Sequence, residues 1–375
     1  MTGEPEANQP GLFLADGSFF RGVPFGAASD CTGEVVFNTG MVGYPESLTD
    51  PSYHEQILLL TYPLQGNYGV PGGGTTGPLG IPECFESDRI RVKGLVVSRL
   101  CEADCASHHS SSRSLHEWLL EQGVPGLSGV DTRALTRRIR HSGTMPGYMG
   151  TASGRPASLR DPNLRDLVAE VSRRDVVSLD PGSSGEHPTV VLVDCGLKAG
   201  IARCLLARGM RVLVVPHDHY FPGMDLDGLV ISNGPGDPAL CSVVARNVGR
   251  ALALGKPILG ICLGHQILAL AAGAGTYKLP FGHRGQNQPC LELPGGAGAR
   301  CYLTSQNHGY AVEESSLPED WTTWMRNAND GSVEAIRHGT RPFTGVQFHP
   351  EASPGPTDTA WIFDMFADQL RGARG

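Results

Sequence analysis

The stretch Pro257-Ile258-Leu259-Gly260-Ile261-Cys262-Leu263-Gly264-His265-Gln266 decides the fold of this chain. Its apolar start, residues 258–261, is typical of a short strand that is covered on both faces. Two glycines flank Cys262 in the pattern Gly-x-Cys-x-Gly, which is the nucleophile-elbow spacing with cysteine in place of serine. We therefore predict a strand, a sharp turn at Cys262 and a helix that continues to about residue 271.

This turn would place Cys262 at the N-terminus of a helix. Free amide groups and the helix dipole favour a negatively charged sulfur there. The same amides can bind the oxyanion that forms when the sulfur attacks a carbonyl carbon. A cysteine at this position is equally compatible with a small buried hydrophobic residue, so the surrounding chain has to decide between the two interpretations.

The chain after residue 188 alternates between short apolar runs and helical patterns, which predicts a parallel sheet with helices on both faces. We expect strands at residues 189–194, 212–215, 229–232 and 344–348, and helices at residues 199–208, 242–254 and 357–370. The segments 289–293, 301–304 and 333–337 are typical of β-hairpins.

The first half reads as β-rich, with short strands in residues 11–60 and a hairpin turn at Asp16-Gly17. Two helices are expected, at residues 114–122 and 131–139. The predicted fold class is therefore α/β. A β-rich N-terminal domain (residues 9–152) is followed by a Pro-, Gly- and Ser-rich linker (153–188) and by a domain with an open, mostly parallel sheet (189–372).

Composition narrows the function classes. The chain has 375 residues, and 40% of them are hydrophobic and 18% charged, as in ordinary globular proteins. A net charge of -8 argues against a nucleic-acid partner. No apolar run reaches the ~20 residues that span a bilayer, and the acidic N-terminus resembles no targeting peptide. We expect a cytoplasmic protein without membrane contact.

No metal site is expected. Cys101, Cys105, His108 and His109 are metal-ligand types at close spacing, but a Ser-rich tract follows them. A loop with scattered reduced thiols is the preferred interpretation, because ten cysteines in a long chain do not form a dense disulfide framework.

In open α/β sheets, functional sites gather at the carboxyl ends of the strands. Besides Cys262, the loop 232–238 (SNGPGDP) falls there, and its exposed amides suit a carbonyl oxygen or a carboxylate. His349-Pro350-Glu351 follows the last strand. Pro350 is expected to hold His349 extended, so that His349 and Glu351 point to one side and form a histidine–carboxylate pair. Such a pair could accept the thiol proton and return it to a leaving amine.

The Cys262 motif together with His349-Pro350-Glu351 resembles the class I, triad-type glutamine amidotransferases. Further stretches are similar to the small subunit of carbamoyl phosphate synthase, in particular its eukaryotic form, which is often fused to the synthase. They are residues 33–53 (GEVVFNTGMVGYPESLTDPSY), 130–140 (VDTRALTRRIR), 232–238, 281–289 (FGHRGQNQP), 305–312 (SQNHGYAV) and 346–356 (VQFHPEASPGP). The resemblance covers about residues 11–370. One departure is Gly200, two residues after Lys198, at a position where the family usually has asparagine.

The resemblance implies a role for individual residues. Cys262 would attack the side-chain amide of L-glutamine, His349 would be the general base and acid, and Glu351 would orient His349. The amides of Leu263 and Gly234 would bind the oxyanion. The family's glutamine-contacting positions fall on Ser52, Gly236, Gln266, Asn307, Gly309 and Tyr310.

The resemblance also implies a partner, a large ATP-using subunit or fused domain that receives ammonia and makes carbamoyl phosphate from bicarbonate. No cofactor is expected in this chain, with ATP and magnesium on the partner. The nearest approach to a phosphate-binding loop, Gly249 with Gly255-Lys256, has the wrong spacing and is followed by Pro257 instead of Ser or Thr.

Three alternatives remain at this point. The chain could be the glutaminase component of another amidotransferase, which the long N-terminal domain argues against. It could be a stand-alone thiol hydrolase with the same triad, which the glutamine-site motifs argue against. A non-catalytic regulatory module is disfavoured because both Cys262 and His349 are present.

Overall fold

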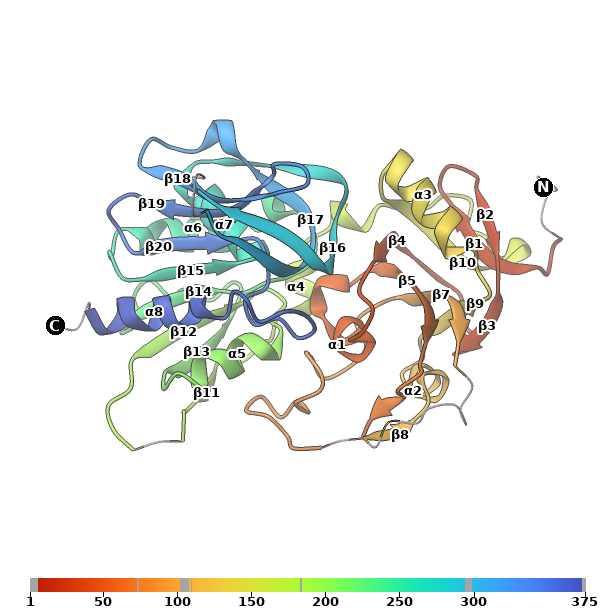
Figure 1. The fold of residues 1–375 in the computed structure, drawn as a ribbon, viewed down its shortest axis with the longest axis horizontal. Helices are drawn as coiled ribbons and strands as arrows, with labels where there is room; N and C mark the ends of the chain where they lie inside the picture. Colours follow the sequence, from red (N-terminus) through yellow and green to blue (C-terminus); the bar gives the residue numbers. More distant parts are fainter. Residues whose placement is uncertain are drawn as a thin grey trace. The chain divides into compact units, whose positions relative to one another are not determined.

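The structure is a computed structural model that describes residues 6–72, 74–101, 108, 110–182, 184–293 and 299–372. The chain divides into two compact units (Figure 1). Unit 1 comprises Met1–Thr76 and Pro82–Leu164, and unit 2 comprises Gly77–Ile81 and Arg165–Gly375. No helix of the described residues is long and apolar enough to cross a membrane.

Unit 1 is built on an eight-stranded mixed sheet with the order β2-β1-β10-β4-β5-β7-β9-β3. Strands β4, β5, β7 and β9 run parallel to one another, and the remaining pairs are antiparallel. Two short strands, β6 and β8, form a separate pair. The strands are β1 Pro10–Leu14, β2 Phe19–Arg21, β3 Val23–Gly26, β4 Cys31–Asn38, β5 Gln56–Gln65, β6 Val70–Pro71, β7 Gly94–Leu100, β8 Ser111–Arg113, β9 Pro125–Ser128 and β10 Met145–Thr151.

Three helices accompany this sheet: α1 Tyr44–Thr49, α2 Leu115–Glu121 and α3 Thr132–Ser142. The two helices expected from the sequence, α2 and α3, are confirmed, and their starts follow from capping. Ser114 and Glu117 form a reciprocal capping box at α2, and the Asp131 carboxylate accepts from the Ala134 amide at α3.

Unit 2 contains a ten-stranded sheet with the order β11-β13-β12-β14-β15-β20-β19-β18-β16-β17. Its centre, from β13 to β20, is parallel, and both ends are antiparallel. The strands are β11 Val177–Leu179, β12 Thr189–Asp194, β13 Arg211–Pro216, β14 Gly228–Ile231, β15 Ile258–Ile261, β16 Gly275–Glu292, β17 Cys301–Glu313, β18 Trp321–Asn327, β19 Val333–His338 and β20 Phe343–Val346. The helices are α4 Leu167–Val171, α5 Ala199–Leu206, α6 Ser242–Leu252, α7 Leu263–Ala272 and α8 Trp361–Gly372.

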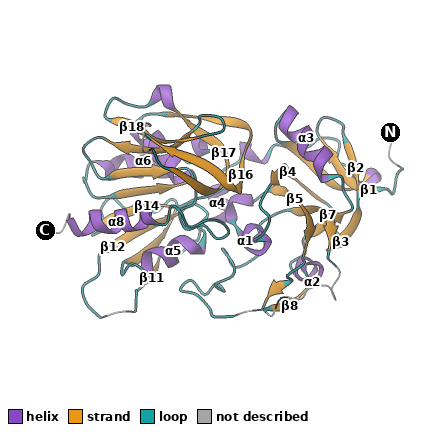
Figure 2. Ribbon diagram, viewed as in Figure 1, coloured by secondary structure: helices purple, strands orange, loops and turns teal. Residues whose placement is uncertain are grey.

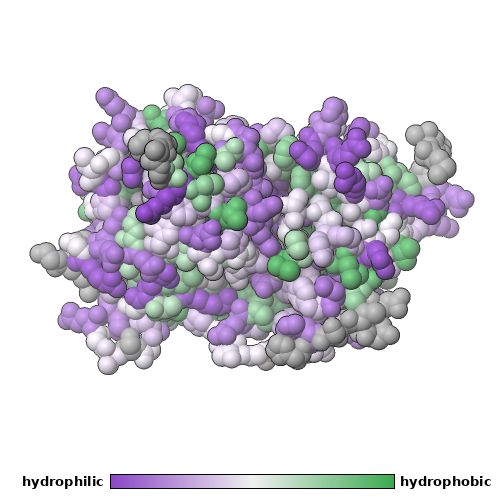
Figure 3. All heavy atoms as spheres, viewed as in Figure 1, coloured by the Kyte–Doolittle hydropathy of each residue, from purple (hydrophilic) through white to green (hydrophobic). Residues whose placement is uncertain are grey.

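The parallel strands are covered on both faces, as their apolar runs predict. Along β12, Val190 and Leu192 join one hydrophobic cluster, and Val191 and Val193 join another. Helices α5 and α8 contribute to the first cluster, and α6 and α7 to the second. Figure 2 shows α5 and α8 lying along the strands of the sheet. On the face drawn in Figure 3, hydrophobic residues lie scattered among polar ones, because most apolar side chains are inside.

The boundary between the units lies at Leu164/Arg165, inside the stretch 153–188 that the sequence suggests as a linker. Part of that stretch is structured, since β11 pairs antiparallel with β13 and forms the edge of the unit 2 sheet. Leu167 and Val168 of α4 are also buried. Strand β11 has only three residues, too few for periodicity to distinguish it from a loop, which explains why the sequence did not predict it.

Candidate active site

The turn at Cys262 has the strained geometry of a nucleophile elbow. Cys262 lies between β15 and α7 with φ 54° and ψ -107°, a backbone region that residues with a side chain rarely adopt. Strand β15 sits between β14 and β20 in the parallel centre of the sheet (Figure 1). The predicted strand, turn and helix are therefore confirmed.

Both flanking glycines are required by space. A Cβ on Gly260 would lie 2.4 Å from the Gly264 carbonyl oxygen, and a Cβ on Gly264 would lie 2.1 Å from the Ile231 carbonyl oxygen. Neither neighbour is a flexible side chain, so the backbone itself would have to move. The Gly-x-Cys-x-Gly spacing thus lets α7 approach β14 and β15 closely enough to hold the cysteine in its turn.

The Cys262 side chain is buried, with 2% of the residue exposed. Its Sγ donates to the backbone oxygen of Asn307 over 3.5 Å, and its amide donates to Val346 O over 2.8 Å. The following amide, from Leu263, begins α7 and has no carbonyl of its own helix to bind. The Leu263 amide, which directly follows Cys262 in the chain, is therefore a candidate donor to an oxyanion.

His349, Glu351 and Lys198 form a buried charged cluster. His349 Nδ1 lies 2.6 Å from Glu351 Oε1, and Lys198 Nζ lies 2.9 Å from the same oxygen. The side chains of these three residues are at most 3% exposed. Lys198 Nζ also donates to Ala352 O over 2.7 Å. The His349 and Glu351 pair is thus present, and a lysine that the sequence did not suggest holds the carboxylate from the other side.

The pair forms for a different reason from the one expected. Strand β20 ends at Val346, and residues 349–352 form a turn closed by a hydrogen bond from Ala352 N to His349 O. Ala352 adopts φ 56° at the end of this turn. Residues 350–351 form this turn instead of continuing an extended chain, and the turn folds the carboxylate back against the imidazole ring. The extended conformation expected at His349 itself stays a prediction.

The electrostatics of the cluster favour its charged forms. Burial lowers the pKa of His349, but the Glu351 carboxylate and the Cys262 side chain together outweigh burial, and the pKa of His349 is raised. Burial would raise the pKa of Glu351, but Lys198 and His349 outweigh it and lower that pKa. His349 Nε2, the ring nitrogen away from Glu351, is buried and makes no hydrogen bond with the described residues.

The loop 232–238 lies beside the Lys198 segment. Cys195 N donates to Ser232 Oγ, and Lys198 N donates to Asn233 Oδ1, both over 2.9 Å. A Cβ on Gly234 would lie 2.0 Å from Cys195 O, so the loop packs directly on this backbone. Gly236 has φ 88°, which favours glycine. These contacts fix a loop whose amides were expected to bind the substrate.

The other expected glutamine contacts in unit 2 cluster around β17. Asn307, Gly309 and Tyr310 lie on this strand. Gln266, in the first turns of α7, donates from Nε2 to Tyr310 O over 2.7 Å and to Gln347 Oε1 over 3.0 Å. The backbone oxygen of Asn307 thus contacts the Cys262 sulfur, and Gln266 links α7 to the same strand, β17.

Ser52 belongs to unit 1. It lies in the single helical turn Pro51–Tyr53, where its amide donates to Asp50 Oδ1 over 2.9 Å. Its contact with glutamine stays a prediction. Of the possible zinc ligands near Cys101, Cys105 and His109 lie outside the described residues.

Two protein families match this chain. Residues 191–369 match the family described as glutamine amidotransferase class-I. Residues 12–149 match the carbamoyl-phosphate synthase small chain, CPSase domain. The two matches correspond to most of unit 2 and most of unit 1.

Several curated relatives are similar to nearly the whole chain. The multifunctional protein CAD of Squalus acanthias is 49% identical over 97% of this chain and 16% of its own length. The multifunctional protein pyrABCN of Emericella nidulans is 47% identical over 96% of this chain and 17% of its own. The chain thus spans about a sixth of the length of these two relatives.

A third relative is closer in length. The carbamoyl phosphate synthase arginine-specific small chain of Aspergillus oryzae is 44% identical over 96% of this chain and 79% of that protein. Similarity at this level over most of both chains shows common descent and a common fold. The chain therefore belongs to the carbamoyl-phosphate synthase small chain family.

Proposed function

We propose that this chain is the glutaminase component of a glutamine-hydrolysing carbamoyl phosphate synthase, with Cys262 as its nucleophile. The observation that carries the proposal is the buried arrangement of the strained Cys262 turn with the charged cluster of His349, Glu351 and Lys198. A cysteine, an imidazole and an orienting carboxylate are the groups that acyl transfer through a thioester requires.

In the first half of the reaction, Cys262 Sγ attacks the side-chain carbonyl carbon of L-glutamine, and its proton passes to His349. The oxyanion that forms is bound by the amides of Leu263 and Gly234. The carbon–nitrogen bond then breaks while His349 protonates the leaving group, which departs as ammonia. A γ-glutamyl thioester remains on Cys262.

In the second half, His349 accepts a proton from water, and the water oxygen attacks the thioester carbon. The carbon–sulfur bond breaks, glutamate leaves, and the proton returns to the sulfur. Glu351 keeps the imidazole oriented and stabilises its protonated form, and Lys198 keeps Glu351 ionised. Lys198 is thus a positioning residue in this scheme.

Glutamine would be held by Ser52, Gly236, Gln266, Asn307, Gly309 and Tyr310. Released ammonia would reach a large subunit or fused domain that uses ATP and magnesium to make carbamoyl phosphate from bicarbonate. Both arrangements occur by name among the relatives, as a small chain and as multifunctional proteins. No cofactor is assigned to this chain, and we place it in the cytoplasm.

The test is an assay of glutamate release from glutamine, with and without a synthase large subunit. The variant Cys262→Ser should lose glutamine hydrolysis by at least about a thousandfold. Carbamoyl phosphate synthesis from added ammonia, measured in the complex, should survive. The exposed Cys301 supplies a matched control, since Cys301→Ser should hydrolyse glutamine at the parent rate. Parent-rate hydrolysis by Cys262→Ser would refute the proposal.

A further inference from the structure

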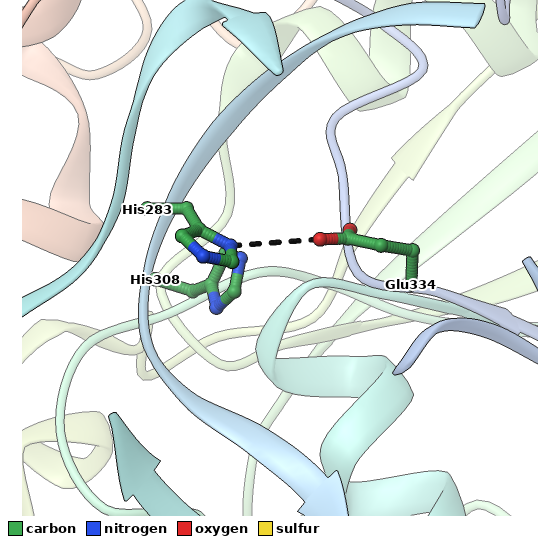
Figure 4. Close-up of side chains that lie close together, drawn as sticks. All are labelled: His283, His308 and Glu334. Atoms are coloured by element: carbon green, nitrogen blue, oxygen red, sulfur yellow. Dashed lines mark ion pairs between the residues drawn. The ribbon is translucent and has the colours of Figure 1, made fainter. Parts of the chain in front are cut away.

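A second cluster of ionisable side chains includes a residue of β17, the strand that carries the expected glutamine contacts Asn307 and Tyr310. His283 on β16, His308 on β17 and Glu334 on β19 each offer one nitrogen or oxygen, and these three atoms lie within 4.8 Å of one another. Figure 4 shows ring nitrogens of both histidines near the Glu334 carboxylate. All three residues are buried, and Glu334 is 0% exposed. The residues come from distant parts of the chain, so no sequence motif indicated them.

Within the described residues, the Glu334 carboxylate is surrounded by two neutral amides and by the His283 ring. Its two oxygens accept from the neutral amides of Gln306 and Asn327, over 2.8 and 3.0 Å. His283 Nδ1 lies 3.5 Å from Glu334 Oε1, which is long for a hydrogen bond. A fully buried carboxylate is costly unless a positive charge is bound to it.

The same 3.5 Å separation suits two ligands of one metal ion. Nitrogen and oxygen ligands of a tetrahedral zinc ion lie about 3.3–3.6 Å apart, given the usual zinc bond lengths. The other nitrogen of His283, Nε2, lies 2.8 Å from Asp330 Oδ2. Histidines that bind metals usually donate their second N–H to a carboxylate in this way, which fixes the tautomer with the free nitrogen toward the metal.

In His308, as in His283, one ring nitrogen is hydrogen-bonded to an oxygen acceptor. Its Nδ1 lies 2.8 Å from the backbone oxygen of Tyr310, an acceptor, so Nδ1 carries the proton. In the neutral imidazole with its proton on Nδ1, Nε2 carries a lone pair that a metal ion can bind.

The lone pair on His308 Nε2 faces another hydrogen-bond acceptor. His308 Nε2 lies 3.1 Å from Gln306 Oε1, while the Gln306 amide nitrogen is directed at Glu334. Two facing lone pairs repel unless a cation lies between them, the ring carries a second proton on Nε2, or the amide is turned around. A turned amide would put its oxygen against Glu334, which would then need a proton.

We propose that His283, His308 and Glu334 form a zinc-binding site, with Asp330 orienting His283 and Gln306 Oε1 as a further oxygen ligand. Two imidazoles and a carboxylate are a ligand set that zinc accepts, with a fourth position left for another ligand. The ion would cross-link β16, β17 and β19. It would rigidify the part of β17 that carries Asn307 and Tyr310. The proposal stands independently of the proposed glutaminase function.

The test is zinc binding to the full chain, prepared without a polyhistidine tag and stripped with a chelator. Titration with zinc against a competing chromophoric chelator should show one tightly bound zinc ion per chain. The variants Glu334→Gln and His283→Asn should lose this zinc ion. Asp330→Asn, whose side chain is 42% exposed, should bind about 10–100-fold more weakly. Three variants should keep the equivalent: Cys262→Ala, Cys301→Ser and the double variant Cys101→Ser/Cys105→Ser.

Cobalt provides a readout on the unchanged chain that does not depend on a variant folding. Cobalt at this site should give visible bands of tetrahedral nitrogen and oxygen coordination without a thiolate charge-transfer band. The proposal is overturned if the stripped chain binds no equivalent, if Glu334→Gln binds as tightly as the parent, or if the bound cobalt shows a thiolate ligand. In the first case, a proton shared with Glu334 takes the place of the ion.

Discussion

Among residues that do not react with the substrate, Lys198 is the one whose loss should lower the stability of the chain most. It is 3% exposed and pairs with Glu351. Removing one partner of a buried pair leaves an uncompensated charge, so Lys198→Met should lower the free energy of unfolding by about 3–5 kcal/mol. Urea unfolding measures this. Lys93→Met is the control, because Lys93 Nζ pairs with Glu55 at a 43% exposed side chain and should contribute at most about 1 kcal/mol. Equal losses in both variants would contradict the role of Lys198.

The pH dependence of stability should report the Glu351 carboxylate. Its pKa in the folded chain falls from an ordinary 4.5 to about 2, because Lys198 and His349 outweigh the effect of burial. A lowered folded-state pKa stabilises the chain above pH 4.5, and this stabilisation is lost as the pH falls toward 2. The stability difference between the parent and Glu351→Gln should therefore shrink between these two values. A constant difference in urea unfolding over this range would argue against an ionised Glu351.

The sequence predicted Cys262, His349 and Glu351, because each lies in a short local pattern. Lys198 could not be found in this way, since its partner Glu351 lies far along the chain and a lone lysine has no chemical signature. The zinc ligands proposed above also lie far apart in the sequence. Their proximity depends on the register of β16, β17 and β19, which no single segment encodes.

At the level of elements, the close packing of α7 on the sheet depends on Gly264. Its Cβ would meet Ile231 O at 2.1 Å, so Gly264→Ala should cost about 1–3 kcal/mol or more and displace Cys262. Gly249 in α6 is the matched control. A Cβ there would lie 3.6 Å from Ala271 O, an ordinary van der Waals contact, and Gly249→Ala should be neutral or stabilising by up to about 1 kcal/mol.

Thermal unfolding and glutaminase assays of the two alanine variants measure the difference. Comparable stability and activity in both would show that the turn tolerates a side chain at position 264.

The sequence predicted the strands and helices better than it predicted which strands pair with one another. The alternation after residue 188 predicted β12, β14, β15 and the helices between them, because buried parallel strands are continuous apolar runs. In unit 1 the β-rich character was confirmed, but its partly parallel sheet was not foreseen. The crossovers that join its parallel strands contain little regular helix, apart from α1 and α2, so they give no βαβ rhythm.

At the level of the whole molecule, each unit has its own sheet. Chains with more than one such unit commonly unfold in more than one step. We expect the calorimetric enthalpy of unfolding to exceed the van't Hoff enthalpy. Differential scanning calorimetry of the full chain gives both values from one experiment, and equal enthalpies would mean that the two units unfold as one cooperative body.

The central claim is that Cys262 carries the substrate's acyl group. The direct measurement is a single-turnover reaction with glutamine labelled at its side-chain carbonyl carbon, stopped in acid and followed by peptide mass spectrometry. We predict a γ-glutamyl adduct on the peptide that contains Cys262, formed before labelled glutamate appears. Release of labelled glutamate with no adduct at Cys262, or with the adduct on another cysteine, would contradict the account.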